Sequence, residues 1–127
     1  MQVRRLTEST ATVEEAVKAV GCEPAQIAKS LVFVADGDPI LCIASGAHRI
    51  DVERLAAVLD VAEVRAATGF SVGGVPPFGH GLPVVLDAAL LDQDHVWAAG
   101  GDGHSLFEIA PRKLADCTEA TVAILGV

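Results

Sequence analysis

The sequence predicts a mixed α/β fold in which a mainly antiparallel sheet packs against helices. Short turn signals separate most of the apolar runs, and short turns join antiparallel strands. The chain has 127 residues and is 51% hydrophobic, with four Phe, one Trp and no Tyr. Its apolar residues are mostly Ala, Val and Leu, which suit a sheet covered by helices. This length is typical of one domain, so residues 1–127 are expected to form a single domain.

The expected strands are short apolar or alternating runs bounded by turn residues. They are residues 2–6, 28–35, 40–44, 82–86, 95–99, 105–110 and 121–125. The second and third of these runs flank the turn Asp36-Gly37-Asp38-Pro39, which predicts a β-hairpin.

Capping residues mark the expected helices. Thr12 and Glu15 form a capping box, and Gly21 is suited to end the helix that follows. Asp51 is expected to cap a second helix, whose apolar residues recur at helical spacing. Shorter helical stretches are expected over residues 25–27, over residues 61–67 and from Pro111 through Leu114.

The net charge of −8 argues against a protein that coats nucleic acid, because neutralising phosphates requires Lys and Arg. So few aromatic residues also argue against a face that stacks many bases. Neither observation excludes a site that grips one end of an RNA. No signal peptide or membrane span is visible, so the expected compartment is the cytoplasm.

The cysteines and histidines show no metal-ligand pattern. Cys22, Cys42 and Cys117 are far apart, odd in number and form no CxxC, so they are expected to be reduced and mostly buried. The four histidines also lack ligand spacing, so neither a metal nor a cofactor is expected. His48 and His95 are expected to be solvated, and Asp87 to be a strand-end residue.

The stretch over residues 73–80 packs three glycines, two prolines and one histidine into a short loop. Proline fixes φ and glycine permits positive φ, so this composition is typical of a rigid loop. Such a loop can direct backbone N–H groups at a ligand, as an oxyanion hole does. The alternative is a tight connection between two strands.

Lys29 interrupts an otherwise apolar strand, and it is either a solvated edge residue or a point charge for a phosphate or carbonyl. A second glycine-rich turn, residues 100–103, precedes His104 and is either a hairpin or part of a site. His80 and His104 could act as general bases, although no Ser/His/Asp or Cys/His order is evident.

Three segments carry a family resemblance. They are Gln26-Ile27-Ala28-Lys29-Ser30-Leu31-Val32-Phe33, Gly73-Gly74-Val75-Pro76-Pro77-Phe78-Gly79-His80, and Ala98-Ala99-Gly100-Gly101 before Phe107-Glu108-Ile109. In this order they closely resemble the YbaK/ProX family of aminoacyl-tRNA deacylases, which is related to the editing domain inserted in bacterial prolyl-tRNA synthetases. The resemblance spans about residues 7–116. Two departures are a further N-terminal helix that is absent here and a shorter connection over residues 60–67.

The resemblance implies a mixed sheet, partly closed into a barrel and flanked by helices. Its pocket would hold the aminoacyl end of a mischarged tRNA, with Lys29 on the terminal adenosine's phosphate or on the aminoacyl group. Backbone amides near Gly73 and Gly74 would form the oxyanion hole, and water or a substrate group would attack. The further substrate-binding residues it implies are Ser30, Val75, Pro76, His80, Gly100, Gly101 and His104.

The expected activity is therefore a freestanding, metal-free aminoacyl-tRNA deacylase that corrects a synthetase's errors. Its expected partner is mischarged tRNA, with no membrane and no DNA, and the resemblance allows association with an aminoacyl-tRNA synthetase. One alternative is a catalytically inactive family member that binds a nucleotide, a tRNA end or a partner protein. Another is a structural subunit that dimerises through an exposed sheet edge. The sequence leaves the amino acid and the oligomeric state open.

Overall fold

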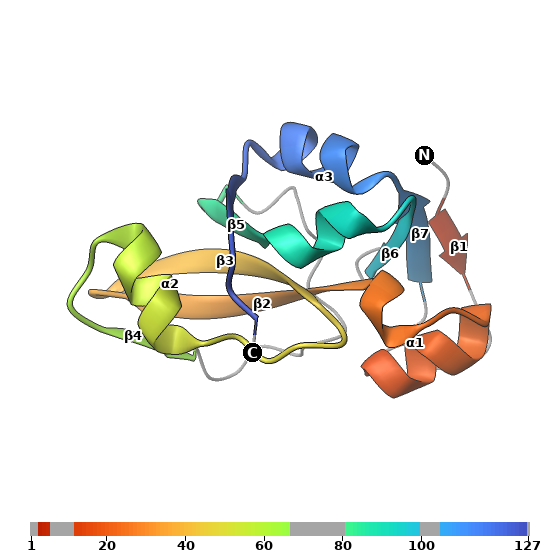
Figure 1. The fold of residues 1–127 in the computed structure, drawn as a ribbon, viewed down its shortest axis with the longest axis horizontal. Coiled ribbons are helices and arrows are strands. Elements are labelled where there is room, and N and C mark those ends of the chain that lie inside the picture. The colour runs from red at the N-terminus through yellow and green to blue at the C-terminus, as the bar shows by residue number, and fades with distance from the viewer. Residues whose placement is uncertain (1–2, 6–11, 67–80, 100–104, 127) are drawn as a thin grey trace.

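The computed structural model describes residues 3–5, 12–66, 81–99 and 105–126. Two long strands, β2 (Ile27–Ala35) and β3 (Asp38–Ser45), form a hairpin along the long axis of the molecule (Figure 1). The other strands are β1 (Val3–Arg5), β4 (Val64–Ala66), β5 (Val84–Asp87), β6 (Val96–Ala99), β7 (Ser105–Ile109) and β8 (Thr121–Ala123). They form one sheet in the order β1-β7-β6-β2-β3-β5-β8, and β4 pairs with β2 outside this path.

The sheet is mixed and mainly antiparallel, which confirms the fold class. The antiparallel pairs are β1·β7, β2·β3, β2·β4 and β6·β7. The parallel pairs are β2·β6, β3·β5 and β5·β8. In the described ranges the path ends at β1 and β8, which do not pair with each other, so the sheet is open. The expected partial barrel is wrong here, because closure requires the two edge strands to share a ladder.

Helices cover both faces of this sheet. The α-helices are α1 (Val13–Val20), α2 (Val52–Leu59) and α3 (Pro111–Thr118), and two 3₁₀ turns are η1 (Pro24–Gln26) and η3 (Ala88–Asp92). The main apolar cluster joins α3 and η3 to one face through residues such as Leu41, Leu86 and Leu114, all fully buried. No helix in the described ranges is long and apolar enough to cross a membrane.

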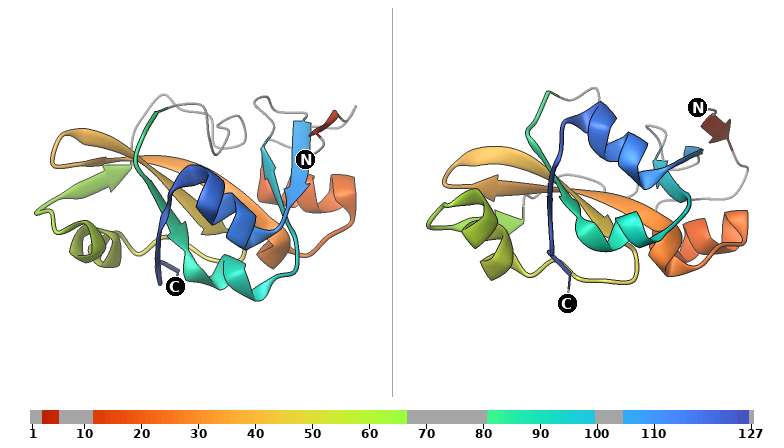
Figure 2. Two further views of the ribbon diagram at one scale, coloured as in Figure 1. Left: turned by 90° about the horizontal axis from the view of Figure 1, so that it is seen from above. Right: turned by 45° about the horizontal axis from the view of Figure 1, so that its top comes forward.

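Two separate clusters lie on the other face. One packs α2 against β2 and β3, with Leu55, Phe33 and Cys42 buried. The other packs α1 against Ile27 and Leu106. Figure 2 shows α1 and α2 at opposite ends of the β2–β3 hairpin. We call the stretch of β2 between these two clusters, residues 28–30, the inter-helix gap.

The local boundary signals are confirmed. The Thr12 hydroxyl accepts a hydrogen bond from the Glu15 amide at 3.1 Å, and Gly21 ends α1 with φ 70°. The Asp51 carboxylate accepts from the amide of Glu53 at 3.1 Å at the start of α2. Asp36 and Gly37 both have positive φ, as a two-residue hairpin turn of type I′ requires, so the strand resumes earlier than expected, at Asp38.

The helix expected over residues 61–67 is wrong, because Val64–Ala66 forms strand β4. This strand pairs with residues 33–35 of β2. The Asp36 carboxylate accepts hydrogen bonds from the amides of Ala62 at 3.1 Å and Glu63 at 2.8 Å, which holds the segment beside the hairpin turn. A non-local ladder here overrides a weak local helical preference.

Replacing Gly46 with alanine should destabilise the fold. A Cβ at Gly46 would lie 2.6 Å from the Pro24 carbonyl oxygen and 2.9 Å from Val13 Cγ1, and the carbonyl belongs to the backbone. Overpacking of this kind costs about 1–3 kcal/mol of unfolding free energy, measurable by urea denaturation. The control Ala47→Ser, at the exposed neighbouring residue, should change stability by no more than about 0.5 kcal/mol. Equal stability of the two variants would contradict this prediction.

Candidate functional site

Lys29 lies in the inter-helix gap. Side chains alternate along a strand, so Lys29 shares a face with Ile27 of the α1 cluster and Leu31 of the α2 cluster. Its strand lies between β6 and β3, but β6 pairs only with residues 27–28, so Lys29 occupies a stretch of the β2 edge that no described strand covers, and its side chain is half-buried rather than fully solvated. The half-buried ammonium donates a hydrogen bond from Nζ to the main-chain oxygen of His48, over 3.0 Å.

In the part of the chain that the structure describes, Lys29 is a cation without a full counter-charge. Burial lowers the pKa of Lys29, and the positive charge of Arg49 lowers it further. Among the described residues the ammonium forms no ion pair, and only the dipole of the His48 carbonyl faces it. Perturbed, partly buried ionisable groups of this kind are typical of functional sites, although structural networks also produce them.

One edge of β2 is incompletely paired beside Lys29. Strand β6 pairs with residues 27–28 and β4 pairs with residues 33–35. No strand in the described ranges pairs with residues 29–32 on that edge, whereas β3 pairs along the whole opposite edge. The sheet is therefore forked at Lys29.

Ser30 is 2% exposed, and its hydroxyl has no hydrogen-bond partner among the residues that the structure describes. A buried hydroxyl left unpaired costs about 1–3 kcal/mol. By strand alternation it faces the main apolar cluster, opposite to Lys29. Lys29 and Ser30 are neighbours in the sequence and both lie at the fork, but their side chains point to opposite faces of the sheet.

The other expected site residues lie outside the described residues. They are Gly73, Gly74, Val75, Pro76, His80, Gly100, Gly101 and His104. Their roles stay predictions from the sequence and its resemblance.

The structure adds a His–Asp pair that sequence reasoning missed. His48 Nδ1 lies 3.4 Å from Asp87 Oδ2, and Asp87 is 1% exposed. The His48 side chain is 38% exposed, so it is partly solvated as expected while one ring nitrogen faces this carboxylate. His95 is exposed as expected. Strands β3 and β5 are parallel, so the residues that follow them meet at one edge of the sheet. That topology, which brings the two side chains together, is the signal that was missed.

The three cysteines differ in burial. All three are free. Burial raises the pKa of Cys42 to about 12, and it also raises the pKa of Cys22. Cys117 is exposed, contrary to the expected burial, because it lies on the outward side of α3. No group of three potential metal ligands is found in the described ranges.

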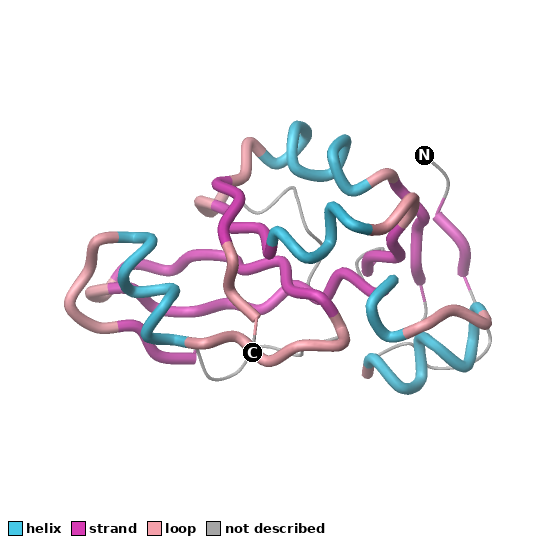
Figure 3. The backbone as a smooth tube through the Cα atoms, in the orientation of Figure 1, coloured by secondary structure: helices cyan, strands magenta, loops and turns pink. Residues whose placement is uncertain are grey.

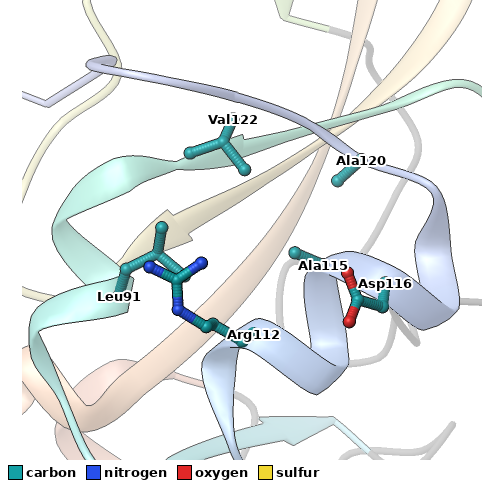
Figure 4. A pocket seen from close by; sticks show the side chains of 6 residues that line it. All are labelled: Leu91, Arg112, Ala115, Asp116, Ala120 and Val122. Carbon is teal, nitrogen blue, oxygen red and sulfur yellow. The ribbon is translucent and has the colours of Figure 1, made fainter.

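A separate pocket of about 170 Å³ lies between η3, α3 and β8 (Figure 4). It is lined by Leu91, Arg112, Ala115, Asp116, Ala120 and Val122. None of these residues belongs to the expected site, and the pocket lies beside α3, on the face opposite to Lys29. We assign it no role.

Replacing Arg49 with glutamine should raise the pKa of Lys29. The change removes a like charge, but burial is the larger cause, so the pKa should stay below the ordinary 10.5. A titration of ¹³Cε-labelled lysine by NMR measures this directly. Arg65→Gln, which removes an exposed arginine from β4, is the matched control and should leave Lys29 unchanged. A Lys29 titration unaffected by Arg49→Gln would contradict the prediction.

Comparison with known proteins defines the class. The sequence model of the aminoacyl-tRNA editing domain matches residues 7–117, so the chain belongs to this family. The family resemblance expected from the Lys29 strand and the two glycine-rich segments is therefore confirmed.

Individual relatives are similar over most of this chain. A solved structure described as a candidate trans-editing enzyme for prolyl-tRNA synthetase has a TM-score of 0.90 and 42% identity, covering 99% of this chain and 86% of that one. The Bacillus subtilis protein YwhH is 36% identical over 96% of this chain and 84% of its own length. A proline–tRNA ligase of Nitratidesulfovibrio vulgaris is 31% identical over 76% of this chain, which corresponds to only 18% of the ligase.

Proposed function

We propose that this protein is a freestanding deacylase that hydrolyses the ester of mischarged aminoacyl-tRNA. The observation that carries the proposal is Lys29, a half-buried ammonium without a carboxylate partner among the described residues, at the fork of the sheet. Membership of the editing-domain family supports it, as does similarity to a candidate trans-editing enzyme and to a segment of proline–tRNA ligases. On that basis we propose that the substrate is a tRNA charged in error by prolyl-tRNA synthetase.

The proposed reaction needs little covalent chemistry from the protein. Water adds to the ester carbonyl carbon, and the ribose hydroxyl of the terminal adenosine leaves with a proton, giving free amino acid and tRNA. An aminoacyl ester is already activated, so positioning and oxyanion stabilisation can carry its hydrolysis. No metal or cofactor has a step in this scheme.

We assign the roles as follows. Lys29 holds a phosphate or the aminoacyl group as a compact positive charge. The amides of Gly73 and Gly74 stabilise the oxyanion. Ser30 is buried on the face of β2 opposite to Lys29, so we assign its hydroxyl no contact with the substrate. The remaining substrate-binding residues are Val75, Pro76, His80, Gly100, Gly101 and His104.

A panel of tRNAs, each charged with a correct or an incorrect amino acid, tests the proposal. We expect release of the amino acid from at least one mischarged tRNA, prolyl-tRNA synthetase products first, at a rate that EDTA does not change. Binding of a charged tRNA without its hydrolysis would instead support the alternative, a catalytically inactive member of the family.

A further inference from the structure

Residue His48 joins two parts of the molecule through two different groups. Its main-chain oxygen accepts the hydrogen bond from Lys29 Nζ at 3.0 Å, and its imidazole Nδ1 lies 3.4 Å from Asp87 Oδ2. A displacement of the backbone at this residue would therefore change both contacts at once. The ring and the carbonyl are linked through the backbone of one residue.

The Asp87 carboxylate is a fixed anchor. Its Oδ1 accepts a hydrogen bond from the Ala89 amide at 3.2 Å, where η3 begins, and the side chain is 1% exposed. A buried carboxylate is stable only when both oxygens find partners. His48 Nδ1 is the partner of Oδ2 in the described ranges, so Asp87 and the imidazole hold each other in place.

The C-terminal segment closes over the ring. A Cβ at Gly126 would overlap the imidazole, reaching within 2.6 Å of Cγ, so the Gly126 backbone packs directly on His48. Gly126 pairs with Ile50, and its carbonyl accepts a hydrogen bond from Arg54 Nη1 at 3.2 Å. Figure 3 shows this segment meeting the loop that runs from β3 to α2.

We propose that His48 is a positioning residue, clamped between Asp87 and Gly126, whose main-chain carbonyl sets the place of the Lys29 ammonium. The inference rests on the proposed function, because the proposed deacylation provides the substrate that the Lys29 ammonium would bind. The positioning can also be tested without the reaction. Removing the ring should release the His48 carbonyl and change the surroundings of Lys29 whether or not any ester is hydrolysed.

Three variants test the clamp. His48→Ala removes the ring, and Gly126→Ala displaces it without touching its chemistry. His48→Asn keeps a donor near the place of Nδ1 and should restore much of what alanine loses. His95→Asn, at an exposed histidine, is the matched control.

We expect His48→Ala and Gly126→Ala to lower kcat for deacylation by about tenfold, with KM within about twofold, because small misplacements slow positioned reactions strongly. In the same variants the pKa of Lys29, followed by NMR titration, should fall further, because the ammonium loses the carbonyl that stabilises its charged form. His48→Asn should recover at least half of the lost rate, and His95→Asn should match the wild type.

A Lys29 titration that is unchanged in folded His48→Ala and Gly126→Ala proteins would overturn the clamp. If the Lys29 titration changes in these variants but the wild-type protein hydrolyses no charged tRNA, the clamp stands and the proposed function is overturned. A purely structural role would lower the melting temperature of His48→Ala without a change in kcat or in the Lys29 titration, and that result too would refute the inference.

Discussion

Lys29→Ala is expected to hydrolyse mischarged tRNA at least about 10²-fold more slowly than the wild type, because a misplaced ester loses the benefit of orientation. The protein should fold normally. The variant loses one hydrogen bond to the His48 carbonyl, worth about 1 kcal/mol net, so its melting temperature should fall by no more than about 5 °C. Deacylation rate and thermal melting, measured on the same preparations, separate the two effects.

Two further variants sharpen this test. Lys29→Arg should rescue poorly, since a planar guanidinium does not replace a compact ammonium in a confined space. Lys18→Ala, at an exposed lysine on α1, removes the same charge and should retain the wild-type rate. Full activity in a folded Lys29→Ala protein would show that the mechanism proposed here is wrong at its centre, even though the family assignment would stand.

Gly74→Val is expected to lower the deacylation rate by about 10²-fold or more, which is the loss that follows removal of one oxyanion donor. Gly74 lies outside the described residues, so this prediction rests on the sequence and the family. If its amide approaches the ester carbonyl, a branched side chain would block that approach. Single-turnover kinetics with saturating enzyme measure the chemical step directly.

Gly74→Ala provides a graded comparison and should fall between the wild type and the valine variant. Both proteins should bind charged tRNA, because only the approach of the carbonyl is obstructed. Normal turnover by a folded Gly74→Val protein would mean that residues 73–80 only connect two elements of the sheet.

Features that depend on neighbours in the sequence could be predicted. The hairpin turn at Asp36 and Gly37 needs positive φ at both positions, and the caps at Thr12 and Asp51 need a side-chain oxygen beside the first amides of a helix. In each case the residue type itself carries the physical reason. The family resemblance likewise depended on short segments with distinctive composition.

Features that depend on which strands pair could not be predicted in this way. Lys29 was recognised as unusual, but only the strand pairing shows that it lies half-buried at the fork, between the stretches of β2 that pair with β6 and with β4. The His48–Asp87 contact depends on the parallel pairing of β3 with β5. These two strands are separated in the sequence by α2 and β4. Residues 64–66 form a strand because they pair with the edge of β2, which their own composition does not reveal.

The pairing of β1 with β7 also constrains how the chain folds during its synthesis. Val3 is opposite Phe107, so the first strand finds its partner only after more than one hundred further residues have been translated. At about 5–20 residues per second, this takes about 5–20 s, during which β1 emerges from the ribosome with no partner strand. The β2–β3 hairpin, by contrast, closes over a two-residue turn and can form as soon as Ser45 leaves the exit tunnel. On the ribosome, the β2–β3 hairpin can therefore form before β1 pairs with β7, although β1 is translated first.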